Sequence, residues 1–177
     1  QFKYEQARAE KIWGRIQLDL LHLGYNAETR QAIAELYQFL KASHEKDGLF
    51  VGYHVFPHSL EVAHIALIAG HNKKFSSDLT LDMFVGALIH DYEPRPAYQA
   101  PKALKTIELL ENDSELNAIL SSLPVDRDNI VYFIRGTNFP ITEADKTAIS
   151  GFVASINESR RASVEEAIRL VAAIDKS

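Results

Sequence analysis

The sequence predicts an all-α fold, a single compact multi-helix bundle, on three observations. Apolar residues recur at helical spacing along most of the chain, and no segment alternates with period 2 between turn residues. Neither a repeat nor a low-complexity linker divides the 177 residues, whose 46% hydrophobic content suffices for one sizeable core. We therefore expect one helical domain over residues 1–177. Because the chain opens on Gln1 and not on Met, we expect it to be trimmed or excised from a longer one.

Four helices are expected in the first half of the chain. Asn26 is suited to cap the second of them, and Pro57 is suited to the first turn of the third. Residues 47–56 have the character of an irregular connection between these two helices. The expected helical ranges are 2–23, about 27–46, 57–70 and 77–91.

Five further helices are expected in the second half. The last one is marked by Ser163-Val164-Glu165-Glu166, which has the pattern of a capping box, and by an apolar stripe that follows it. We therefore expect that helix to begin at Ser163. The stripe consists of Ile168, Val171 and Ala172, and the four preceding helices are expected near 99–111, 114–122, 126–136 and 142–157.

Composition excludes several classes of function. The absence of cysteine excludes disulfides, thiolate zinc sites and a thiol nucleophile. A net charge of -5 provides no basic field to attract nucleic acid or an anionic membrane, and no apolar run approaches the roughly 20 residues that span a bilayer. No signal-peptide pattern follows Gln1. We expect a cytoplasmic protein with a small-molecule partner, and the sequence is compatible with a homo-oligomer.

The most informative residues are His90 and Asp91, which end the most apolar stretch of the chain, residues 83–89. In a helix, His90 shares a face with Met83, and Asp91 shares a face with Phe84. Both polar side chains then point into the core, where burial is costly unless something binds them. A divalent metal satisfies both, since imidazole nitrogen and carboxylate oxygen are common ligands of transition metals.

Two further histidines, His54 and His58, lie four residues apart on either side of Pro57. If Pro57 begins a helix, His58 lies in its first turn and His54 just outside, so both imidazoles can approach one point. The alternative is that they are loop histidines beside aromatic residues, because an H-x-x-x-H spacing is a weak signal on its own.

A late carboxylate, Asp175, lies on the apolar stripe of the last helix, seven residues after Ile168. This placement again puts a polar group where the core is expected. The alternative is a frayed carboxylate at the end of the helix.

Taken together, His58, His90-Asp91 and Asp175 form an ordered H…HD…D set on helices of one α domain, which resembles the HD superfamily of metal-dependent phosphohydrolases. The resemblance covers residues 53–175 and implies an HD-domain bundle with these four residues as metal ligands. The implied cofactor is one divalent transition metal (Mn, Fe, Co, Ni or Zn), and Mg²⁺ is also compatible.

The segment Tyr53–His58 is most similar to the corresponding segment of cyclic-nucleotide phosphodiesterases. This similarity implies that His54 protonates the leaving oxygen, and Asp91 is expected to help accept the proton of the attacking water. Those enzymes have a further histidine just past the HD pair, whereas this chain has none after His90. We therefore expect a single metal.

Three cations are candidates for binding a substrate phosphate: Arg95, Lys102 and Arg135. Each is otherwise explained as an ordinary surface charge.

The function expected from this resemblance is hydrolysis of a nucleotide or another small phosphoester, which makes the chain a metal-dependent phosphoric ester hydrolase. The alternative is a non-catalytic regulatory or ligand-sensing HD module, which would keep the helical scaffold for contacts with other molecules. A metal-dependent oxygenase is disfavoured by the missing downstream histidines.

Overall fold

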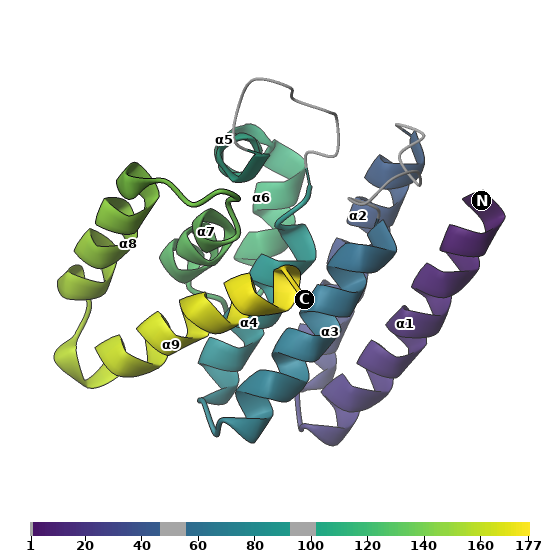
Figure 1. Ribbon diagram of the computed structural model, residues 1–177. Helices are drawn as coiled ribbons and strands as arrows, with labels where there is room; N and C mark the ends of the chain where they lie inside the picture. Colours follow the sequence, from purple (N-terminus) through teal and green to yellow (C-terminus); the bar gives the residue numbers. More distant parts are fainter. Residues whose placement is uncertain (1, 47–55, 93–101) are drawn as a thin grey trace.

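The computed structural model describes residues 2–46, 56–92 and 102–177. These residues form nine α-helices and no β-strand (Figure 1). The expected all-α fold is confirmed. None of these helices combines the length and the apolar character needed to cross a membrane. The helices are α1 Phe2–His22, α2 Ala27–Lys46, α3 Phe56–Asn72, α4 Ser77–Ile89, α5 Lys102–Asn112, α6 Ser114–Ser121, α7 Arg127–Gly136, α8 Glu143–Ser155 and α9 Glu158–Asp175.

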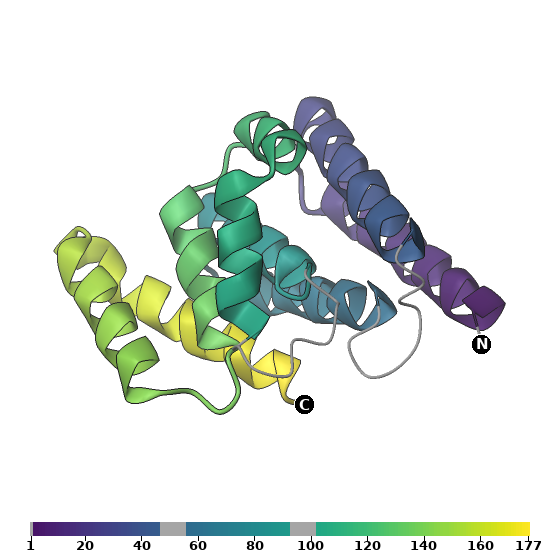
Figure 2. The ribbon, with the colours of Figure 1, turned by 90° about the horizontal axis from the view of Figure 1, so that it is seen from above.

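Helix α4 is the centre of the bundle. Every residue from Leu79 to Ile89 is buried, including the polar Thr80 and Asp82, so this part of the helix is enclosed on all sides. It packs against α3, which precedes it in the sequence, and against α7 and α9, which follow it. Helices α1 and α2 lie beyond α3 on one side, and α8 lies beyond α7 and α9 on the other (Figures 1 and 2).

The early helix boundaries follow from local chemistry. Gly24 adopts a positive φ of 88° where α1 ends, a conformation that glycine tolerates without strain. The Asn26 side chain then accepts a hydrogen bond from the Thr29 N–H, which confirms the predicted cap of α2. Ser76 caps α4 in the same way by accepting from the Leu79 N–H.

The expected start of the last helix at Ser163 is wrong. Helix α9 begins at Glu158 behind the N-cap Asn157, so Ser163 lies inside it. The carboxylate of Glu166 does not return to the backbone of Ser163 but pairs with Lys73 at 3.0 Å. The S-x-x-E pattern is therefore part of a helix interior here.

Close packing of α3 on α4 depends on Gly70. A Cβ atom at this position would lie 2.7 Å from Thr80 Oγ1 and 2.8 Å from Thr80 Cγ2. Because both branches of Thr80 are this close, rotation of its side chain would exchange one clash for another. Gly14 on α1 has no atom within 4 Å of the corresponding position, so it serves as a matched control.

We predict that Gly70→Ala lowers the free energy of unfolding by about 1–3 kcal/mol, the usual cost of overpacking. Gly14→Ala should instead raise it by up to about 1 kcal/mol, because alanine favours the helix. Urea denaturation of both variants measures the difference. A Gly70→Ala protein as stable as Gly14→Ala would contradict the close approach of the two helices.

One carboxylate of α4, Asp82, is buried beside α7. It accepts hydrogen bonds from the Asp126 N–H and from Asn129 Nδ2, both at 2.9 Å. Burial raises the pKa of Asp82 to about 7, although both hydrogen bonds oppose the shift. Between about pH 4 and pH 7 the folded protein therefore binds more protons at this site than the unfolded chain does, and stability falls as the pH rises.

We predict that Asp82→Asn removes this loss of stability between about pH 4 and pH 7. When the Asn129 amide turns over, the new amide can donate to Asn129 Oδ1, an atom with no hydrogen-bond partner in the part of the chain that the structure describes, in place of the present bond from Asn129 Nδ2. Urea denaturation at pH 5 and pH 8 measures the slope, and Asp128→Asn, at an exposed position of α7, should keep it. An unchanged slope in Asp82→Asn would show that Asp82 does not cause it.

Candidate metal centre

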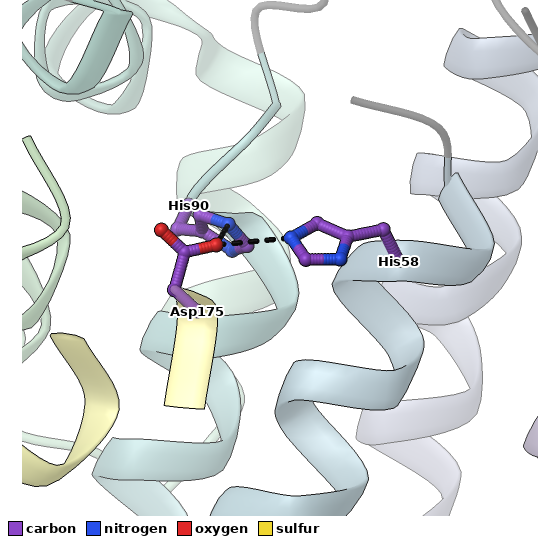
Figure 3. Close-up of side chains that lie close together, drawn as sticks. All are labelled: His58, His90 and Asp175. Atoms are coloured by element: carbon purple, nitrogen blue, oxygen red, sulfur yellow. Dashed lines mark hydrogen bonds and ion pairs between the residues drawn. The ribbon is translucent and has the colours of Figure 1, made fainter. Parts of the chain in front are cut away.

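Three helices bring their ends together around one carboxylate oxygen (Figure 3). Asp175 Oδ1, in the last turn of α9, lies 2.9 Å from His58 Nε2 and 3.0 Å from His90 Nε2. His58 lies in the first turn of α3, and His90 is the C-cap residue of α4. Residues separated by 85 and 117 positions in the sequence therefore meet at one point.

Local sequence explains how each side chain reaches this point. Pro57 is the second residue of α3, where a proline is compatible with the first turn of a helix, and it fixes the position of His58. The buried helix α4 delivers His90 at its end. Helix α9 packs across α3 and α4, and this crossing places Asp175 between the two imidazoles.

The tautomer of His90 is set by the backbone. Its Nδ1 lies in hydrogen-bond contact with the carbonyl oxygen of Ala87, which can only accept, so Nδ1 carries a proton. In the neutral ring Nε2 then has a lone pair, and that lone pair faces the carboxylate oxygen of Asp175. Two acceptors in contact repel each other, so a proton or a metal cation must lie between them. Such a backbone contact on the far ring nitrogen is typical of metal-binding histidines.

Titration of the group follows from the same contacts. Burial by itself lowers the pKa of His90, but the negative charges of Asp91 and Asp175 more than compensate, and the pKa is raised to about 9. Burial would raise the pKa of Asp175, but the hydrogen bonds from His58 and His90 dominate and hold it well below its usual range. At neutral pH Asp175 is therefore ionised and His90 carries a proton, which a metal ion that binds at Nε2 would displace.

His58, His90 and Asp175 can hold a metal ion, because one ligand atom from each lies within 4.8 Å of the others. Ligands at right angles in an octahedral site with bonds of about 2.1 Å lie about 3.0 Å apart, which matches the two distances to Asp175 Oδ1. A tetrahedral site with the same bond lengths needs about 3.4 Å and thus a small outward movement. The His90 side chain is 2% exposed, whereas His58 and Asp175 are each 15% exposed.

Asp91 lies beside the group but is not a member of it. Its Oδ2 is 3.4 Å from His90 Nε2, and its side chain is buried. Since Asp91 follows His90 directly, it leaves the helix end about 100° further round the axis. The structure thus brings together three of the four predicted ligands, and the fourth remains a prediction.

The other predicted site residues are placed only in part. His54 and Arg95 lie outside the described residues, as does the side chain of Lys102, which begins α5. Arg135, at the end of α7, donates from Nε to Asp145 Oδ1 at 3.1 Å. One edge of its guanidinium is therefore used within the fold, and its role in substrate binding remains a prediction.

Sequence reasoning missed the contribution of Ala87, whose carbonyl oxygen orients His90. The signal was available, because Ala87 lies three residues before His90 and hence on the same face of the helix. What the sequence does not show is that the ring turns back onto this carbonyl.

No family model, no curated protein and no solved structure matches the chain. The function of the protein is therefore inferred from the geometry of this group and from the residues that compose it.

We predict that the protein binds about one divalent ion per chain and that His90→Ala and His58→Ala each abolish this binding. Each substitution removes one of three candidate ligands. His90→Ala additionally removes the imidazole between the buried carboxylate of Asp91 and the half-buried carboxylate of Asp175, and should lower stability. Elemental analysis after dialysis against Mn²⁺ or Zn²⁺ measures the metal content.

The matched control for this experiment is His64→Ala. His64 Nε2 also contacts a carboxylate, Asp19 Oδ2, at 2.6 Å, but this pair is not part of the three-ligand group. His64→Ala should keep the wild-type metal content. Wild-type metal content in folded His90→Ala and His58→Ala would refute the assignment.

Proposed function

We propose that this protein is a metal-dependent phosphohydrolase of the HD type that acts on a nucleotide or another small phosphoester. The observation that carries the proposal is the contact of both His58 Nε2 and His90 Nε2 with the single oxygen Asp175 Oδ1. The ordered pattern His58, His90-Asp91, Asp175 resembles that superfamily, and three of these four side chains meet in the fold.

The charge of the group suits a divalent cation with open coordination positions. Two neutral imidazoles and the carboxylates of Asp91 and Asp175 nearly neutralise a charge of +2. A divalent ion bound here supplies Lewis acidity toward a phosphoryl oxygen and lowers the pKa of coordinated water. The nitrogen and oxygen ligands suit Mn²⁺, Fe²⁺, Co²⁺, Ni²⁺ or Zn²⁺, and Mg²⁺ is compatible with the carboxylates.

The residues of the chain then have distinct roles in the proposal. His58, His90 and Asp175 hold the cation, and Ala87 keeps the Nε2 lone pair of His90 directed toward it. Asp91, whose Oδ2 lies 3.4 Å from His90 Nε2, is proposed to help accept a proton from an attacking water. His54 is proposed to protonate the leaving oxygen, a role that rests on the sequence resemblance alone.

Positive charge near the site is the second part of the proposal. A phosphoester transition state spreads negative charge over several oxygens, which fixed cations stabilise. Arg95, Lys102 and Arg135 are proposed to supply this charge. A cytoplasmic location and a small phosphorylated molecule as partner belong to the same proposal.

We predict that the protein hydrolyses at least one member of a panel of nucleoside monophosphates, diphosphates and cyclic phosphates with added Mn²⁺, Co²⁺ or Mg²⁺. A chelator should abolish this activity. Asp175→Asn should lower turnover by at least about 100-fold, because it removes the charge that both imidazoles face.

Asp19→Asn is the matched control, since Asp19 also contacts a histidine but belongs to no group of three ligands. It should keep wild-type turnover. A metal-loaded protein that hydrolyses no member of the panel would overturn the proposal and favour a regulatory or ligand-sensing module.

A further inference from the structure

The connection between α7 and α8 holds an aromatic side chain, Phe139, in water. Phe139 is 83% exposed, more than any other large hydrophobic residue in the described part of the chain. An isolated exposed apolar side chain needs no explanation by itself. The backbone around Phe139, however, is anchored on both sides.

The anchor is the buried carboxylate of Asp145. It accepts hydrogen bonds from Asn138 Nδ2 at 3.2 Å and from the Thr142 N–H at 3.0 Å, so it ties together the residues before and after Phe139. Asn138 in turn accepts from the Ala103 N–H at the start of α5. The position of the Phe139 backbone is thus fixed by the fold before anything binds to the ring.

The ring lies at the same end of the bundle as the metal-ligand group. Lys176, which directly follows Asp175, places its Nζ 5.7 Å from the centroid of the Phe139 ring. The start of α5 and the end of α9 both adjoin the α7–α8 connection, as Figures 1 and 2 show from two directions. The exposed ring therefore lies against the side chain of the residue that follows Asp175, at the end of α9 where both histidines contact that carboxylate.

We infer that Phe139 is a specificity-determining residue that stacks against a planar ring of the substrate while the phosphate of the same molecule lies at the His58–His90–Asp175 group. This inference rests on the proposed function and narrows it to phosphoesters that carry an aromatic ring such as a nucleobase. Stacking on an aromatic side chain is tolerant of the identity of the base, so the ring selects for a base but not for one particular base. The Lys176 ammonium adds a positive charge beside the ring for the phosphate.

The test compares two ligands, one with a nucleobase on the sugar and one without it. Isothermal titration of the Mn²⁺-loaded protein with the non-hydrolysable 5′-phosphonate analogues of adenosine monophosphate and of ribose 5-phosphate gives two dissociation constants without turnover. Wild type should bind the adenosine compound about 5- to 100-fold more tightly than the ribose compound. Phe139→Ala should remove this preference and leave the affinity for the ribose compound unchanged.

Two further variants show whether the aromatic face is the cause. Phe139→Trp should keep or increase the preference, whereas Phe139→Leu, which retains apolar bulk, should lose most of it. Ile141→Ala changes an exposed apolar side chain in the same connection and should have no effect. All four substitutions are at exposed positions, so the variants should fold.

The outcomes separate this inference from the function on which it rests. If wild type binds both ligands and Phe139→Ala leaves their ratio unchanged, Phe139 is not the stacking residue although the phosphohydrolase proposal stands. If metal-loaded wild type binds neither ligand, the phosphate-binding function itself is refuted, and the inference with it.

Discussion

The shared oxygen of Asp175 is the contact on which the candidate site depends. Two imidazoles from different helices both approach it, so the oxygen fixes where the ends of α3, α4 and α9 lie relative to one another. A carboxylate oxygen that faces two imidazole nitrogens is stable there only with a proton or a metal cation among them. In the absence of metal, a proton on His90 provides that charge, which is why the pKa of this residue is raised to about 9.

Much of the fold could be predicted because its signals are local. The apolar run before His90 predicted the buried helix at the centre, and Asn26 predicted the start of α2. The start of α9 could not be predicted in the same way. A serine followed three residues later by a glutamate fits both a helix start and a helix interior, and only the contact of Glu166 with Lys73 on another helix distinguishes the two.

The group that could hold a metal was visible in the sequence because its members break the pattern of the core. His90 and Asp175 are polar residues at positions where helical spacing requires apolar ones, and such exceptions are visible in the sequence. Contacts between residue types that are common on protein surfaces cannot be recognised from the sequence in this way. Nothing in the spacing of Arg135 and Asp145 shows that they pair, and nothing around Phe139 shows that its ring stays in water.

The distances along the chain between the ligands have a consequence for folding. Asp175 lies 85 residues after His90 and 117 after His58, so the group closes only when the two halves of the bundle have docked. Local helix formation gives neither half a complete set of ligands. An ion that binds only the closed group adds its binding free energy to global stability, about 2.7 kcal/mol at a free concentration of 100 times Kd. Metal availability would then control the free energy of unfolding of the whole domain as well as the chemistry at one end of it.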